Sequence, residues 1–249
     1  MYQQGKFDDA LQGFAAVLSS PNNPFTEKSL LNSGTIYFGN KKRYESALEM
    51  YSRLETSADF PENITAAAAG QMRCHFLLGH YEQAIAQAQK ILQADNTSPE
   101  LQNETHLIYG KSSFNLNDLA AAESQLSFLS KLPGSASVAE AKYYLAAIQY
   151  KLNNFKESQK IIFEIVNQVP AYDYWVAKGF ILLADNYLAL KDTFQAKETY
   201  KSIVDKYERS PSDADDVRGI AAEKLDALTP KLPEPKKPEE IKEEQEEIK

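Results

Sequence analysis

Two sets of side chains in this 249-residue sequence have the types and spacing needed to bind another molecule. Three cations, Arg73, Lys111 and Lys151, could pair with carboxylates of a partner, although solvation alone would also satisfy them. Large apolar side chains at regular spacing could grip an extended peptide or a helix, or could instead pack between neighbouring helices. This second set, the aromatic row, is Phe38, Phe76, Phe114, Tyr150 and Leu188, and Tyr143 is a further candidate contact.

The sequence offers little that could perform catalysis. It contains no Gly-rich phosphate loop and no nucleophile elbow, so we expect no enzyme activity and no cofactor. His75 and His80 follow Cys74, but five positions along a helix place side chains about 140° apart, so the two would diverge unless the helix breaks at Gly79. We therefore expect no metal site there. The acidic residues Asp213, Asp215 and Asp216 are expected at a helix N-terminus, where the helix dipole favours them, rather than in a calcium loop.

A repeat determines where these side chains lie. A small residue, an apolar residue four positions later and another three positions after that recur along the chain at intervals of 37, 37, 38, 36 and 38 residues. A fixed period of this length, with two helices per period, indicates a helical solenoid. The small residues form the alanine column: Ala10, Ala47, Ala84, Ala122, Ser158 and Ala196.

Start signals place the helices within each repeat. The spacing predicts helices at about 24–39, 44–57, 61–78 and 81–94. Asn23-Pro24 marks the start of the first of these, and Ser98-Pro99 marks the start of the helix that follows them. Ser137 with Glu140 is expected to form a capping box. A small residue stands twelve positions before most of the alanine column, but Gly34 stands thirteen before Ala47. We expect the turn at residues 41–43 to absorb the extra residue.

These residues resemble the tetratricopeptide repeat family. Gly79-His80-Tyr81 with Ala84, and Gly5-Lys6-Phe7 with Ala10, match the family's turn and second helix, and the resemblance extends over residues 1 to 208. It implies an all-α fold, a right-handed α-α superhelix of antiparallel helix pairs whose first helices line a concave groove. Leu31 and Thr35 stand where chaperone-binding members carry Lys and Asn, so their carboxylate clamp is not expected.

The second helices, such as the one ending at Tyr207 to Pro211, are also similar to those of bacterial cell-envelope repeat proteins of the outer-membrane-assembly lipoprotein and Tol-Pal coordinator types. This resemblance implies a periplasmic or cell-envelope location, with the cytoplasm as the alternative. The chain opens at residues 1–5 in what reads as the end of a first helix. We therefore expect the sequence to be part of a longer protein.

Composition limits the partners. A net charge of −8 and a pI near 5.1 argue against nucleic acid, which needs a basic surface. No run of eighteen apolar residues occurs, so no membrane insertion is expected, and Cys74 alone cannot form an intramolecular disulfide.

The expected organisation has three parts: a solenoid at 1–209, a capping helix at 210–229 and a Pro/Glu/Lys-rich linker or tail at 230–249. We expect a non-enzymatic scaffold that binds a peptide or protein partner in the groove. The alternative is a repeat segment of a larger enzyme or regulator that positions a further domain. The expected groove residues are Phe38, Arg73, Phe76, Lys111, Phe114, Tyr143, Tyr150 and Lys151.

Overall fold

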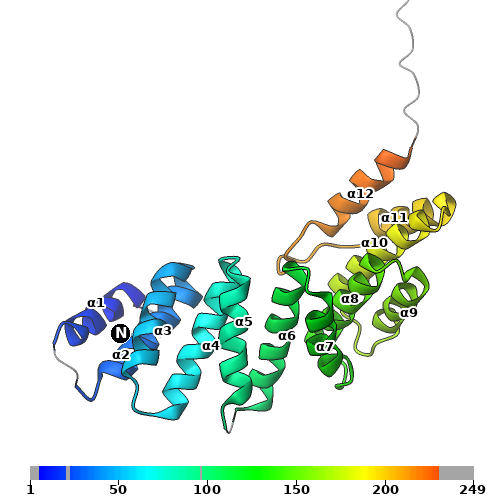
Figure 1. Ribbon diagram of the computed structural model, residues 1–249. Coiled ribbons are helices and arrows are strands. Elements are labelled where there is room, and N and C mark those ends of the chain that lie inside the picture. Colours follow the sequence, from blue (N-terminus) through cyan, green and yellow to red (C-terminus); the bar gives the residue numbers. More distant parts are fainter. Residues whose placement is uncertain (1–5, 21–22, 96, 230–249) are drawn as a thin grey trace, which may run out of the picture. The chain divides into compact units, whose positions relative to one another are not determined.

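A computed structural model describes residues 6–20, 23–95 and 97–229, and every regular element in these ranges is a helix (Figure 1). The expected all-α fold is therefore confirmed. The elements are α1 (Phe7–Leu18), α2 (Thr26–Thr35), η2 (Ile36–Asn40), α3 (Tyr44–Ser57), α4 (Pro61–Leu77), α5 (Tyr81–Gln93), α6 (Pro99–Asn115), α7 (Leu119–Ser130), α8 (Ala136–Lys151), α9 (Phe155–Val166), α10 (Asp173–Ala189), α11 (Thr193–Lys206) and α12 (Val217–Leu228).

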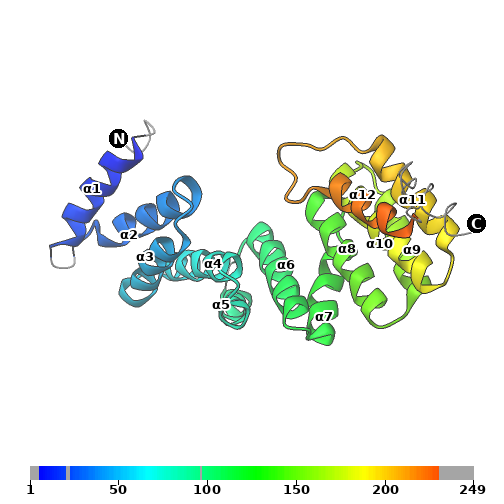
Figure 2. The ribbon, with the colours of Figure 1, turned by 90° about the horizontal axis from the view of Figure 1, so that it is seen from above.

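The chain forms two compact units, residues 1–179 and residues 180–249. In the first unit, each helix packs against the next in the chain, and α2, α4, α6 and α8 also contact one another in succession. Figures 1 and 2 show these pairs following one another in chain order. This is the packing of a helical solenoid, in which each repeat buries its apolar face against its neighbours. The predicted domain boundaries stay predictions, and the tail at 230–249 lies outside the described residues.

The alanine column marks where the helices cross. Ala47, Ala84, Ala122, Ser158 and Ala196 have no exposed surface, and Ala10 keeps only 5%. A small side chain at a crossing lets two helix backbones approach closely, so that larger neighbours can interlock around it. The repeat read from the sequence is therefore a repeat of buried contacts.

Tyr51 shows how tightly this seam is filled. Its ring lies between Gly34 on α2 and Gly70 on α4, and is 6% exposed. A Cβ atom at Gly70 would lie 2.5 Å from the ring, and one at Gly34 would lie 2.7 Å from it. Both distances are shorter than real carbon contacts, so both positions require glycine as long as the ring stays in place.

The turns between paired helices share one conformation. The residue five positions before the alanine column has a positive φ in all five complete repeats, between 54° and 77°. Only one of the five is glycine. They are Lys42, Gly79, Asn117, Asn153 and Lys191.

The second repeat corrects one expectation. Lys42 keeps the same place before Ala47 as its counterparts in the other repeats, so the turn is not where the extra residue is absorbed. Instead, α2 continues into the π-helix Ile36–Asn40, where the Lys41 N–H donates to the Ile36 carbonyl at 3.0 Å. A π-turn holds one more residue per turn than an α-turn, which lengthens the helix segment without changing its end.

Two helix starts also differ from expectation. The hydroxyl that caps α8 belongs to Ser135, which accepts from the Val138 N–H at 3.3 Å, so Ser137 and Glu140 do not form the expected capping box. Helix α2 begins at Thr26 rather than Pro24, because the Asn23 side chain accepts from the Phe25 N–H and holds a turn before the helix. Ser98, expected at a helix start, caps α6 by accepting from the Leu101 N–H. Of the three acids expected at a helix N-terminus, Asp216 caps α12 by accepting from the Gly219 N–H, and Asp213 and Asp215 precede that helix.

The second unit is held around a buried tyrosine. Tyr200 on α11 has no exposed surface, and its hydroxyl donates to the Asp185 carboxylate on α10. Lys224 on α12 donates to the same carboxylate at 2.8 Å. One carboxylate therefore joins three helices of this unit. None of the described helices in either unit is long and apolar enough to cross a bilayer.

Candidate functional site

Ion pairs connect successive first helices of the first unit. The Arg73 guanidinium on α4 donates through Nε and Nη2 to the two carboxylate oxygens of Glu104 on α6, at 2.6 and 2.5 Å. Lys111 on α6 donates to Glu140 on α8 at 2.5 Å. The hydrogen bond with Glu104 raises the pKa of Arg73. Two of the three expected cations, Arg73 and Lys111, are thus each paired with a carboxylate of the next repeat.

Lysines also cover the aromatic row. Lys111 Nζ lies 4.9 Å from the centre of the Phe76 ring, and Lys151 Nζ lies 4.6 Å from the centre of the Phe114 ring. Each lysine belongs to the first helix that follows the ring in the chain. An ammonium group this close to a ring face makes a favourable cation–π contact. Phe76, Lys111, Phe114 and Lys151, with Arg73 and the two glutamates, lie on the successive first helices α4, α6 and α8, and we call them the ring–lysine ladder.

The rings of the ladder are half-buried. Phe76 packs against a cluster that includes Met72 and Ile108, and Phe114 packs against one that includes Leu126 and Leu145. Both keep part of their surface in solvent. They therefore contribute to helix packing and keep part of their apolar surface in solvent. The packing interpretation of these two rings is supported, and their binding to a partner stays a prediction.

Contacts within single repeats show how the aromatic row packs. Three of its rings contact the first residue of the second helix in the same repeat: Phe38 with Tyr44, Phe76 with Tyr81 and Tyr150 with Phe155, at 5.6, 6.0 and 5.6 Å between ring centres. Phe38 also packs against Ala47, Tyr51 and Cys74. An aromatic pair across each turn fixes the end of the first helix against its partner.

A second aromatic cluster lies on α8 and α10 within the first unit. The ring centre of Tyr143 is 5.5 Å from that of Tyr144 and 5.6 Å from that of Trp175. Lys178 Nζ lies 5.2 Å from the centre of the Tyr143 ring and 5.9 Å from that of Trp175. The predicted Tyr143 is thus part of a cation–π cluster, and Tyr144 joins this cluster to the ladder, because its ring centre lies 5.3 Å from that of Phe114.

Sequence reasoning missed the acidic half of the ladder and this second cluster. Glu104 and Glu140 each stand eighteen positions before the alanine column, while Arg73 and Lys111 stand eleven before it. A search for opposite charges recurring at fixed positions of successive repeats would have found both pairs. Trp175 and Lys178 carry no such signal, because their partners depend on how α10 packs.

Cys74 is not a candidate nucleophile. Its side chain has no exposed surface, and burial raises the pKa of the thiol to about 12. Because the thiolate is the reactive form, this thiol is inert at neutral pH.

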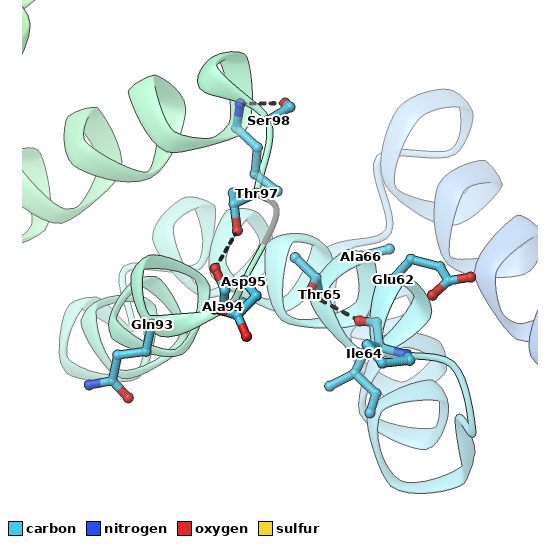
Figure 3. A pocket seen from close by; sticks show the side chains of 11 residues that line it. Glu62, Ile64, Thr65, Ala66, Gln93, Ala94, Asp95, Thr97 and Ser98 are labelled. Carbon is cyan, nitrogen blue, oxygen red and sulfur yellow. Dashed lines mark hydrogen bonds between the residues drawn. The ribbon is translucent and has the colours of Figure 1, made fainter.

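An open cleft of about 720 Å³ lies where the start of α4 faces the end of α5 and the start of α6 (Figure 3). Its hydroxyl groups already have partners in the chain. Thr65 donates to the Pro61 carbonyl, Thr97 donates to two carbonyls at the end of α5, and Ser98 caps α6. The remaining polar groups include the carboxylates of Glu62 and Asp95. We therefore place the candidate site at the ladder rather than in this cleft.

The stacked helix pairs define a helical repeat protein. Residues 180–210 match a family model of the tetratricopeptide repeat. No curated protein matches the chain in sequence.

Solved structures give the same fold. A tetratricopeptide repeat protein from Parabacteroides merdae is similar over 91% of this chain and 84% of its own, with a TM-score of 0.68 and 18% identity. YrrB, a tetratricopeptide repeat protein with an unusual peptide-binding site, is similar over 79% and 91%, with a TM-score of 0.54 and 18% identity. TTC0263, a tetratricopeptide repeat protein from Thermus thermophilus, is similar over 80% of this chain and 98% of its own, with a TM-score of 0.53 and 16% identity. The chain has the tetratricopeptide repeat fold.

Proposed function

We propose that this chain is a non-catalytic scaffold that binds an extended peptide or a helix of a protein partner along the ring–lysine ladder. The observation that carries the proposal is the ladder itself: half-buried rings of successive first helices, each with a lysine over one face. Such a row offers apolar area at intervals of one repeat, which a partner segment can bury. The described peptide-binding site of YrrB, a protein of the same fold, adds support.

The charges of the ladder limit the partner further. Arg73 and Lys111 are compensated by Glu104 and Glu140, so this part of the face gives no net attraction to an acidic segment. Lys151 differs, because its ammonium is exposed and donates to the Asn117 side-chain oxygen at 3.2 Å, a neutral acceptor. The best partner is therefore a segment with apolar side chains near Phe76 and Phe114 and a single carboxylate near Lys151.

The test uses peptides selected from a random library against the whole chain. Calorimetry then compares the wild type with Lys151→Glu and with Lys156→Glu, which makes the same charge change on an exposed residue of α9. We expect Lys151→Glu to weaken binding about tenfold, since a charge pair of this kind is worth roughly 1 to 2 kcal/mol. Equal affinities for the two variants would refute the role of Lys151, and selection of no binding peptide would refute the proposal.

Location is a further part of the proposal. We propose a periplasmic or cell-envelope location from the resemblance of the repeats to envelope proteins of this fold. Fractionation of cells that express the native gene would place the protein with either the envelope or the cytosol. Recovery in the cytosol would overturn this part and leave the binding proposal intact.

A further inference from the structure

Two histidines meet at the turn between α4 and α5. Helical spacing would separate His75 and His80, but α4 ends at Leu77 and Gly79 adopts a φ of 77°. The His80 N–H then donates to the His75 carbonyl at 2.8 Å, and the two ring centres lie 5.7 Å apart. The chain reversal brings together two imidazoles that the sequence pattern predicted would diverge.

The same two positions approach each other in another repeat. Gln149 and Asn154 bracket the turn between α8 and α9 as His75 and His80 bracket theirs, and Asn153 has the same positive φ as Gly79. There the Asn154 side-chain Nδ2 donates to Gln149 Oε1 at 2.9 Å. This turn therefore places the ends of both side chains within bonding distance, and the third repeat has an imidazole at each.

The imidazoles have the chemistry of metal ligands. His75 Nδ1 is buried and has no hydrogen-bond partner, so the structure leaves one ring nitrogen unused. A neutral imidazole nitrogen is the form that binds a transition metal.

We propose that His75 and His80 together bind one divalent transition metal ion of the class that prefers imidazole, such as Ni²⁺, Cu²⁺ or Zn²⁺. Two imidazoles that share an ion at about 2.0 to 2.1 Å from each nitrogen have ring centres roughly 5 to 6 Å apart, as here. Cys74 is not counted as a ligand, because its side chain has no exposed surface and packs in the core.

The site has two protein ligands and open coordination positions. Among the described residues, no group of three His, Cys, Asp or Glu side chains could hold an ion together. Water on the side of the exposed His80 would fill the remaining positions. Such a site binds at micromolar rather than nanomolar concentrations, since each missing ligand lowers the affinity.

The experiment titrates Ni²⁺ into the chain, without a polyhistidine tag, by calorimetry and follows the imidazole signals by NMR. His75→Gln and His80→Gln are compared with His106→Gln, which removes the third histidine, on α6. His80 is exposed, so its variant keeps the fold. We expect one ion per chain, broadening of the His75 and His80 signals, an affinity loss of at least tenfold in either variant, and no change in His106→Gln.

Two results would overturn the proposal. One is unchanged Ni²⁺ affinity in His80→Gln with the circular dichroism spectrum of the wild type. The other is the absence of His75 and His80 broadening in the wild type at millimolar Ni²⁺. Because the peptide test above uses Lys151 on α8, either result leaves the scaffold proposal standing.

Discussion

Tyr51 and Phe114 are both aromatic residues of the first unit, but their surroundings differ in kind. Tyr51 is enclosed by the backbones of two helices, at Gly34 and Gly70, and is 6% exposed. Phe114 is half-buried and is covered on one side by the flexible side chain of Lys151. Backbone cannot move aside for a ligand, whereas a lysine side chain can. The seam around Tyr51 therefore fixes the repeats, and the ladder around Phe114 is where we propose that a partner binds.

The largest effect is expected where the seam is overfilled. Gly70→Ala should lower the free energy of unfolding by about 3 kcal/mol, because the new methyl group would lie only 2.5 Å from atoms of the Tyr51 ring. Urea unfolding would measure this. Gly13→Ala is the matched control: it stands inside α1 with nothing within 4 Å of its Cβ position. It should stabilise the chain by roughly 0.5 to 1 kcal/mol, as alanine does inside a helix. Equal destabilisation by the two substitutions would contradict the account of the seam.

Phe114→Ala should have a smaller effect. A fully buried Phe→Ala change costs about 3 to 5 kcal/mol, so a half-buried ring should cost about 2 kcal/mol. Phe76→Ala should lower the free energy of unfolding by a similar amount, because the Phe76 ring is half-buried too. A measured loss of 4 kcal/mol or more in either variant would show that these rings belong to the core. The ladder would then lose its role as a binding surface.

The ion pair between α6 and α8 comes next. Lys111 and Glu140 keep only 18% and 17% of their side-chain surface, so Glu140→Gln leaves a partly buried ammonium without its carboxylate. We expect a loss of roughly 1 to 2 kcal/mol in thermal or urea unfolding. Lys111→Met in the same chain should restore most of it, since no partly buried charge is then left without its partner. If the second substitution gives no recovery, the pair is not what stabilises this contact.

The smallest effect concerns pH. The pKa of His75 is lower in the folded chain than its usual 6.5. The unfolded chain then binds more protons below that value, so the free energy of unfolding should fall as pH drops from about 7 through the folded pKa. His75→Gln should make this part of the pH profile flatter. Parallel profiles for the wild type and His75→Gln would contradict the shift.

The sequence predicts the helix pairs because the alanine column records the crossings directly. The helix expected at 44–57 is found at Tyr44–Ser57 and the one expected at 81–94 at Tyr81–Gln93. The π-helix at Ile36–Asn40 could not be predicted, because one extra residue can be absorbed in a helix or in a turn at similar cost. The aromatic row and the three cations were predicted, but not that Glu104 and Glu140 compensate two of them, since that depends on contacts between repeats.

The His75–His80 contact was missed for a similar physical reason. A helical wheel assumes that the helix continues, and α4 stops two residues after His75. Gly79 was visible in the sequence as a turn residue, but only its positive φ shows that the chain reverses enough to bring the rings together.

The central claim, that partners bind along the ladder, is tested most directly by photo-crosslinking. A photoreactive phenylalanine analogue replaces Tyr150 on α8 in one variant and Phe163 on α9 in the other; Phe163 is 45% exposed, and it lies on a second helix. Each variant is irradiated with the selected peptide. The account predicts a crosslink from position 150 and none from position 163. Crosslinking from position 163 alone would show that partners bind the second helices and would contradict the account.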